Sequence, residues 1–265
     1  MKLATFRAPG RGEPLAGEVL DDRVVAFRDG TTVVDVLSGR SPERSDDGWP
    51  LSEVELLAPV PEPTAIYAIG LNYAAHASET GGEPPERPIV FVKVRNSVAP
   101  PGGPVRCPAV VRRLDYEGEL VIAVGAGGRI GGYCVADDVT ARDLQGREPQ
   151  WTRAKGADTF CPLGPWITTV DELPDAIGLR LTSYVNGELR QDATTADLIF
   201  GPQQIVDHIA EAIALQPGDL ILTGTPSGVG EGMKPPRYLE PGDVVRCEVE
   251  RLGVIEHQIV DPAAS

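Results

Sequence analysis

Two glutamates separated by one residue are the first feature of this chain that could do chemistry. They lie in the run Leu114–Ile122, which reads LDYEGELVI and predicts a strand. Side chains two positions apart lie on the same face of a strand, so Glu117 and Glu119 repel each other unless a cation lies between them. Paired carboxylate oxygens suit Mg²⁺, Mn²⁺ or Ca²⁺. The polar face of a half-exposed strand would give the same pattern. We expect Glu117→Gln to leave the metal-free fold intact or even to stabilise it.

A second apolar segment ends in a cluster of polar residues that could complete such a site. Residues 132–145 read GYCVADDVTARDLQ. Alternation along a strand lets only one of Asp137 and Asp138 face the two glutamates. Arg142, a few residues further on, could hold a substrate carboxylate through two parallel hydrogen bonds. Capping residues and a surface ion pair are the alternative interpretation.

A histidine and a glutamate three residues apart are a possible acid–base pair. His76 and Glu79 lie in YAAHASE, which favours a short helix, and this spacing places them on one helix face. A carboxylate that binds one imidazole nitrogen leaves the other free to act as a base. A surface pair has the same spacing. Lys93 and Lys155 follow apolar or aromatic residues and are equally compatible with ordinary surface lysines.

The chain resembles the fumarylacetoacetate hydrolase family, in the branch of small acylpyruvate hydrolases and 2-hydroxyhepta-2,4-diene-1,7-dioate isomerase-like enzymes. The resemblance rests on motifs that occur in the family's order, at 70–76, 91–93, 116–120, 132–143, 151–156, 185–188 and 218–230. It implies a mainly β fold with few helices (α+β), namely the family's mixed β-roll with a small β-rich N-terminal domain. We place the boundary at the proline-rich segment 59–63, which gives an N-terminal domain over 1–58 and a catalytic domain over 59–265.

The family frame also assigns roles to individual residues. Mg²⁺ or Mn²⁺ is expected on Glu117, Glu119 and Asp138, and Asp138 is selected because Arg142 follows it by four residues. The catalytic residues implied are His76, Glu79 and Lys155. The substrate-binding residues implied are Lys93, Arg142, Gln145 and Thr225. The glycine-rich run after Thr225 would offer backbone N–H groups to a carboxylate.

The activity implied is metal-dependent hydrolysis of a C–C bond in a 2,4-dioxo acid of the acylpyruvate or fumarylpyruvate type. The metal holds the pyruvate enolate, and His76 activates water. The same metal–enolate chemistry also supports decarboxylation of oxaloacetate-like acids, keto–enol isomerisation, or isomerisation of 2-hydroxyhepta-2,4-diene-1,7-dioate. A catalytically idle metal-binding relative is the interpretation from another class, and no ligand or base is missing from the sequence to favour it.

Composition limits the partners. The chain has 265 residues and a formal net charge of −15, with no Lys/Arg cluster, which argues against nucleic acid and anionic membrane surfaces. We expect a small anionic 2-oxo acid as substrate and a homodimer as the assembly. Four scattered cysteines and the absence of a signal-peptide pattern predict a cytoplasmic protein.

Strands are expected around 65–69, 89–93, 114–124, 131–136, 179–186, 219–223 and 243–250. The dipeptide Asn186-Gly187 predicts a hairpin turn. Residues 202–215 predict a helix with Ile205, Ile209 and Ile213 on one face, and 38–50 is expected to be a loop. Two departures from the family flank the expected site and bear on the substrate. They are a short connection over 119–138 and an insertion-like segment over 231–238.

Overall fold

One large sheet organises the molecule. The computed structural model describes residues 1–262, and in this part of the chain the strand order of the sheet is β4-β3-β2-β1-β14-β12-β11-β17-β6-β7, with β5 paired to β1 and β8 to β14. The strands are β1 Lys2–Arg7, β2 Leu15–Leu20, β3 Arg23–Phe27, β4 Arg44–Pro50, β5 Glu55–Leu57, β6 Ile66–Gly70, β7 Ile89–Lys93, β8 Val98–Ala99, β11 Gly118–Val124, β12 Ile130–Asp137, β14 Cys161–Thr169 and β17 Leu220–Leu222.

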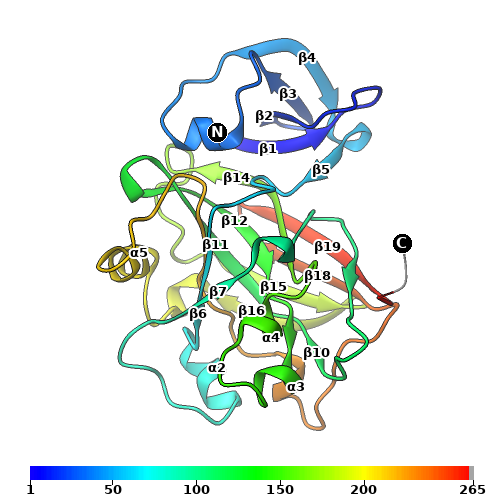
Figure 1. The fold of residues 1–265 in the computed structure, drawn as a ribbon, viewed down its shortest axis with the longest axis vertical. Coiled ribbons are helices and arrows are strands. Elements are labelled where there is room, and N and C mark those ends of the chain that lie inside the picture. The colour runs from blue at the N-terminus through cyan, green and yellow to red at the C-terminus, as the bar shows by residue number, and fades with distance from the viewer. Residues whose placement is uncertain (263–265) are drawn as a thin grey trace.

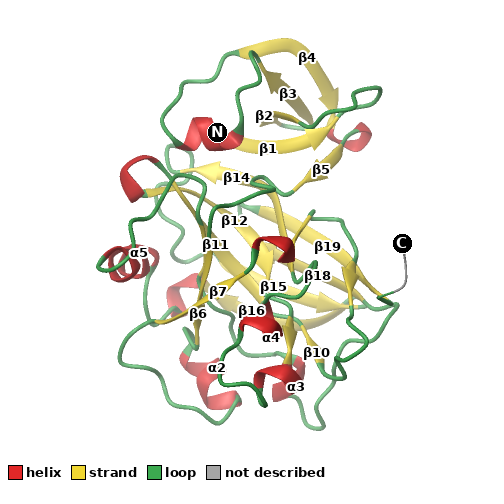
Figure 2. Cartoon of the chain, in the orientation of Figure 1, coloured by secondary structure: helices red, strands yellow, loops and turns green. Residues whose placement is uncertain are grey.

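A second sheet packs against the first and has the order β16-β15-β18-β19-β9. Its strands are β9 Val105–Arg106, β15 Arg180–Val185, β16 Glu188–Thr194, β18 Val244–Val249 and β19 Gly253–Val260. A short ladder joins β10 Leu114–Asp115 to β13 Thr140–Ala141. The helices are α1 Val33–Leu37, α2 Ala74–Glu79, α3 Arg142–Gln145, α4 Thr152–Lys155 and α5 Pro202–Ala210. Figure 2 shows strands through most of the molecule and short helices around them, which confirms the predicted mainly β fold.

Strand β11 shows why both sheets are needed. Leu120 and Ile122 pack into the core shared with the second sheet, whereas Val121 and Ala123 pack into the core on the other face. Alternation along the strand therefore buries both faces, and this explains the uninterrupted apolar run after Glu119. The glutamates are thus attached to one of the most deeply buried strands of the protein.

The N-terminal strands extend the main sheet. Figure 1 shows β1–β5 gathered at one end of the molecule, with β1 beside β14. Leu3 of β1 pairs with Ile167 of β14, so backbone hydrogen bonds join residues on both sides of the predicted boundary. The boundary near residue 58 itself stays a prediction.

Two sequence-based element assignments are wrong. Residues 44–50 form β4 rather than a loop, because their backbone pairs with β3 while the polar side chains face outward at the sheet edge. The helix predicted to reach residue 215 ends at Ala210, and Ile213 is 41% exposed. Beyond Ala210 the backbone continues as a turn, in which the Ala212 and Ile213 N–H groups both donate to the Ile209 carbonyl.

The other elements follow the sequence closely. Strand β7 has the predicted bounds, and Asn186 and Gly187 form the turn between β15 and β16 with φ of 51° and 79°. Positive φ at both positions is the geometry that favours Asn-Gly in hairpins. No helix in the described residues is long and apolar enough to cross a membrane.

Candidate active site

The three predicted metal ligands meet where β11 and β12 leave the sheet. Glu117 precedes β11, Glu119 is its second residue, and Asp138 directly follows β12. One carboxylate oxygen from each lies within 4.8 Å of the others, and all three side chains are buried. The backbone fixes this geometry, because Asp138 N–H donates to the Glu117 carbonyl at 2.8 Å.

The predicted strand over 114–124 is interrupted at this point. It divides into β10 and β11, and Tyr116 and Glu117 lie between them. The two glutamates are therefore brought together by a break in the strand as well as by alternation along it. Asp137, the residue that competed with Asp138 in the sequence, accepts the Glu117 backbone N–H at 2.7 Å.

Two lysines neutralise part of the carboxylate cluster. Lys155 Nζ lies 2.7 Å from Glu117 Oε2 and 2.6 Å from Asp138 Oδ2, and Lys93 Nζ lies 2.5 Å from Asp138 Oδ1. Burial lowers the pKa of Lys155, but Asp138 and Glu117 outweigh burial and raise it, so the ammonium stays charged. Lys93 also donates to the Lys155 carbonyl, and its side chain is fully buried behind Asp138.

The two glutamates have opposite electrostatic environments. Burial raises the pKa of Glu117, but Lys155, Arg142 and His76 outweigh burial and lower it to about 2. Burial raises the pKa of Glu119 well above its usual value, and the charges of Asp138 and Glu117 raise it further. One backbone donor, Gly224 N–H, reaches Glu119 Oε2 at 2.6 Å. Glu117 is paired with Lys155 and Arg142, so like-charge repulsion does not support stabilisation of the metal-free fold by Glu117→Gln, and relief of repulsion is expected at Glu119 instead.

The donor set fits a hard divalent cation. All three ligands offer oxygen, which Mg²⁺ and Mn²⁺ prefer. Lys93 and Lys155 contact Asp138 and Glu117, whereas the hydrogen-bond donor to Glu119 is a neutral backbone N–H, so the two lysines do not balance the charge of three ionised carboxylates. A dication would remove this repulsion and keep all three carboxylates ionised.

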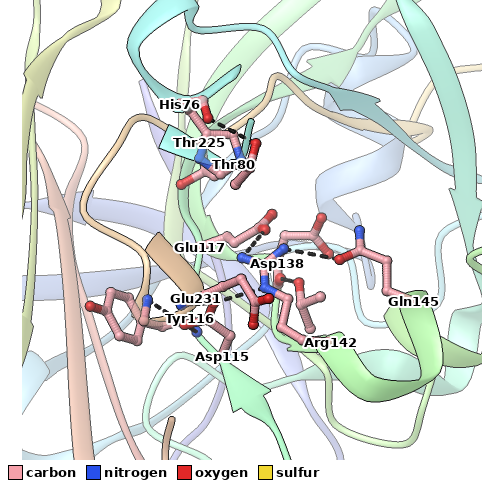
Figure 3. A network of polar contacts seen from close by, with 12 residues as sticks. His76, Thr80, Asp115, Tyr116, Glu117, Asp138, Arg142, Gln145, Thr225 and Glu231 are labelled. Carbon is pink, nitrogen blue, oxygen red and sulfur yellow. Dashed lines mark hydrogen bonds and ion pairs between the residues drawn. The ribbon is translucent and has the colours of Figure 1, made fainter. Parts of the chain in front are cut away.

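A cavity of about 200 Å³ opens beside the carboxylates. Its polar wall is formed by His76, Thr80, Glu117, Arg142, Gln145, Lys155 and Thr225. Its other wall is formed by Ile69, Gly70, Leu71, Phe91 and Trp151. In Figure 3, His76, Thr80 and Thr225 lie together on one side of Glu117, and Asp115 lies on the other. Of the ten predicted site residues, six line this cavity, and Glu79, Lys93, Glu119 and Asp138 lie behind them.

Arg142 is held by protein carboxylates rather than being free to clamp a substrate with its whole guanidinium group. Its Nε donates to Asp115 Oδ2 at 2.8 Å, and one terminal nitrogen lies 2.6 Å from Glu117 Oε1. The other terminal nitrogen donates to Gln145 Oε1 at 3.1 Å. Asp115 and Glu117 raise the pKa of Arg142 against the opposite effect of burial. Asp115 is a site residue that the sequence did not single out, although it directly precedes the Tyr-Glu-Gly-Glu motif.

The predicted acid–base pair is present on α2. His76 Nδ1 lies 3.6 Å from Glu79 Oε2, and His76 is buried against the cavity. Glu79 is fixed from the other side, because Gly228 N–H donates to its carboxylate at 3.0 Å. Gly230 and Glu231 N–H groups donate to Asp115 at 2.7 and 3.0 Å. The glycine-rich run therefore gives these donors to carboxylates of the protein, and the segment after it flanks the site.

A larger groove of about 760 Å³ lies elsewhere, between β5 and the segment 98–106. None of the ten predicted site residues lines it. Size alone therefore does not identify the active site, whereas the convergence of charged groups does.

The chain is similar to known proteins over most of its length. Residues 65–260 match the family model described as fumarylacetoacetate (FAA) hydrolase C-terminal, and the chain belongs to the fumarylacetoacetate hydrolase family. It is 42% identical over 231 residues to protein Rv2993c of Mycobacterium tuberculosis, covering 83% of this chain and 84% of that protein. It is 40% identical over 223 residues to the human mitochondrial oxaloacetate tautomerase FAHD2A, covering 80% and 71%.

Solved structures show the same fold over nearly the whole chain. The crystal structure of 5-carboxymethyl-2-hydroxymuconate delta-isomerase from Mycobacterium smegmatis superposes with a TM-score of 0.83 at 34% identity, covering 98% of this chain and 100% of that one. Two of these three relatives have the names of a tautomerase and an isomerase. They support the isomerase alternative of the sequence analysis better than C–C bond hydrolysis.

Proposed function

We propose that this chain is a metal-dependent enzyme that interconverts the keto and enol forms of a small 2-oxo diacid of the oxaloacetate type. One observation carries the proposal: three buried carboxylates meet within 4.8 Å beside a cavity that also holds His76 and Lys155. The tautomerase and isomerase names of the relatives support the type of reaction.

The charged side chains bind the substrate and favour its enolate form. A divalent cation held by Glu117, Glu119 and Asp138 would polarise the 2-oxo-carboxylate group and stabilise negative charge on the C2 oxygen. Lys155 lines the cavity and adds a fixed positive charge there. Arg142 and Gln145, which are hydrogen-bonded to each other, present polar groups to the rest of the diacid.

The reaction moves one proton between C3 and the C2 oxygen and leaves the composition unchanged. His76 is the side chain suited to this transfer, because its Nδ1 faces Glu79 and its Nε2 is left to take or return the C3 proton. Glu79, fixed by the Gly228 N–H group, would orient the ring once the two side chains close to hydrogen-bond distance. Phe91 and Trp151 cover the cavity on the other side and limit the access of water.

The size of the cavity favours a short substrate. Its volume of about 200 Å³ is below the roughly 300–1,000 Å³ of pockets that hold drug-sized ligands. A four-carbon diacid suits this space better than a seven-carbon dienedioate. Homodimerisation and a cytoplasmic location belong to the same proposal as predictions from the sequence.

Hydrolysis of an acylpyruvate is the second candidate, and the His76–Glu79 pair favours it. A histidine oriented by a carboxylate is the usual arrangement for activating water, and the same enolate would leave when the C3–C4 bond breaks.

Three substrates separate these reactions. Loss of enol absorbance is followed for oxaloacetate, pyruvate release is followed for oxaloacetate and acetylpyruvate, and ultraviolet change is followed for 2-hydroxyhepta-2,4-diene-1,7-dioate. Each assay is run with Mg²⁺, with Mn²⁺ and with EDTA. We expect metal-dependent acceleration of the oxaloacetate keto–enol exchange above the buffer rate. No acceleration at saturating metal, together with turnover of acetylpyruvate, would replace the proposal by hydrolysis.

A further inference from the structure

The break between β10 and β11 leaves backbone groups of the metal-ligand segment without partners in the sheet. Gly118 pairs with Asp137 and Asp115 with Thr140, so the ladders on the two sides of the break keep the same register. Between them the pair Glu117 and Asp138 keeps only one of its two ladder bonds: Asp138 N–H donates to the Glu117 carbonyl, whereas the Glu117 N–H does not bond to the Asp138 carbonyl. Buried backbone N–H groups need partners, and here side chains must supply them.

Two fully buried side chains take this role at consecutive peptide groups. Asp137 Oδ1 accepts the Glu117 N–H at 2.7 Å, and Gln191 Oε1 accepts the Gly118 N–H at 3.0 Å. Asp137 is in turn held from the second sheet, because its Oδ2 lies 3.0 Å from His257 Nε2 and both side chains are fully buried. The direction of the Glu117 backbone is thus set by residues outside the cavity.

Gln191 has the full set of four hydrogen bonds that an amide side chain can make. Besides Gly118, its Oε1 accepts from Ser183 Oγ at 2.8 Å. Its Nε2 donates to Thr225 Oγ1 at 2.7 Å and to the Pro226 carbonyl at 2.8 Å. Thr225 lines the cavity and donates to the Gly118 carbonyl at 3.0 Å. One side chain therefore connects the peptide between two metal ligands to Thr225 on the polar wall of the cavity.

The fold directs Gln191 inward against the hydrophobic pattern of its strand. A bulge in the β15–β16 pairing follows the Asn186-Gly187 turn, and it places Gln191 opposite Ser183. As a result Gln191 is fully buried while Leu189, two positions earlier, is 49% exposed. Burying an amide and exposing a leucine costs hydrophobic stabilisation, which points to a requirement for the hydrogen bonds.

Gly118 provides the close approach that this contact needs. A Cβ atom at Gly118 would lie 3.3 Å from Gln191 Oε1 and 3.3 Å from Cys247 Sγ. These distances are tighter than ordinary van der Waals contact, so a side chain here would push the amide away from the peptide. The glycine between the two glutamates thus belongs to the same arrangement as Gln191.

We infer that Gln191 is a positioning residue for the metal site: it holds the Glu117–Glu119 segment and Thr225 in one rigid unit, so that both carboxylates face the cation before it binds. The inference rests on the proposed metal-dependent function. It predicts that loss of the amide weakens cation binding itself and not only the stability of the fold. Groups of this kind, which orient metal ligands, typically contribute about 10–100-fold to metal affinity.

Binding of Mn²⁺ alone tests the inference without substrate. Free Mn²⁺ is measured by electron paramagnetic resonance during titration of the wild-type protein and Gln191→Met, whose side chain has similar length and no amide. We expect the Kd of the variant to rise by about 10–100-fold. The matched control is Thr195→Val, directly after the same strand. Thr195 is also buried and makes two hydrogen bonds, to Ala176 and Leu179, that are remote from the ligands. The Thr195→Val variant should have a lower Tm and an unchanged Kd for Mn²⁺.

Ser183→Ala is a milder second variant, because it removes one of the four bonds of Gln191 and should raise the Kd by less. If Gln191→Met does not fold, the Mn²⁺ Kd of Ser183→Ala tests the inference instead. An unchanged Kd in a folded Gln191→Met, or in Ser183→Ala where only that variant folds, would overturn the inference. Absence of Mn²⁺ binding by the wild type would overturn both the inference and the metal site. Tight Mn²⁺ binding without oxaloacetate tautomerisation would overturn only the proposed function.

Discussion

The two sides of the cavity are built very differently. The carboxylate side belongs to β11 and β12 in the middle of the main sheet, and all three of its ligands are buried. Glu117 and Asp138 are each contacted by two cationic side chains, and Glu119 accepts the Gly224 N–H. The histidine side belongs to α2, a helix of six residues without a side-chain cap at its N-terminus. Its contact to the rest of the site is the Glu79–Gly228 bond, and the His76–Glu79 distance of 3.6 Å is longer than a hydrogen bond.

In the proposed function, the two sides differ because one binds the cation and the other transfers the proton. A cation site gains from ligands that are fixed before binding, because any reorganisation lowers affinity. Proton transfer requires a base that comes close to carbon only when the substrate is present. We therefore expect the carboxylate side to be rigid in all states and the histidine side to tighten when the cavity fills.

Removing the carboxylate side should have the largest effect. Glu117→Gln takes one ligand from the cation and leaves Lys155 and Arg142 with one carboxylate fewer. We expect loss of metal binding, loss of activity and lower stability of the metal-free protein. Steady-state assays with and without EDTA, with thermal unfolding in EDTA, measure all three. Full activity in excess EDTA would contradict a role for the metal.

Removing the histidine side should have a smaller and more selective effect. His76→Ala is expected to lower tautomerisation, and acylpyruvate cleavage if it occurs, by roughly 10²–10⁴-fold, the usual contribution of a positioned base. Decarboxylation of oxaloacetate should fall much less, because loss of CO₂ forms the enolate without a base. The metal-free Tm and the Mn²⁺ Kd serve as controls and should stay close to those of the wild type. Equal losses in both reactions would mean that His76 only positions substrate.

The two glutamates should differ in their effect on stability against pH. The pKa of Glu119 is raised in the folded state, so the contribution of this group to metal-free stability is fully present below pH 4.5 and is lost as pH rises from 4.5 through the folded pKa. Glu119→Gln should remove this loss, so the metal-free variant is more stable than the wild type at neutral pH and equal to it below pH 4.5. The pKa of Glu117 is lowered to about 2, so its contribution is lost as pH falls from 4.5 towards 2. Urea unfolding in EDTA across this range measures both, and a metal-free Glu119→Gln less stable than the wild type at neutral pH would reverse the assignment.

Hydrogen exchange should show the smallest but most direct difference between the two sides. Residues 76–88 contain the last four residues of α2, the positive-φ Gly81 and the Pro84-Pro85 pair, and they should exchange more slowly when Mg²⁺ and oxalate are added. Residues 117–124 should be protected already without ligand, because β11 is fully buried in the sheet. Complete protection of 76–88 in the unliganded protein would indicate a rigid helix and a preformed base.

The sequence predicted the groups that touch the cation better than those that support them. Glu117, Glu119 and Asp138 follow from strand alternation and the family motifs, and the fold confirms their convergence. The partnership of Arg142 with Asp115, and of Lys93 with Asp138, depends on how three separate strands and a helix meet. No spacing in the sequence contains that information.

Backbone pairing was likewise hidden where the hydrophobic pattern is weak. Strand β4 is polar and exposed at the sheet edge, so its pairing with β3 leaves no periodic signal. Gln191 is a polar residue in a mostly exposed strand, and only the bulge beside it turns it inward. The break at Tyr116 lies inside a run of residues that is continuous and strand-like in the sequence. The break depends on pairing with the neighbouring strands, so the sequence did not predict it.

We expect the three carboxylates at this break to hold the cation that binds the substrate. A crystal structure of the protein with Mn²⁺ and oxalate, with anomalous scattering from manganese, tests it most directly. We predict one strong anomalous peak enclosed by Glu117, Glu119 and Asp138, with oxalate beside it in the cavity lined by His76. A protein that binds oxalate with no manganese peak at these carboxylates, or with the peak at another place, would contradict the claim.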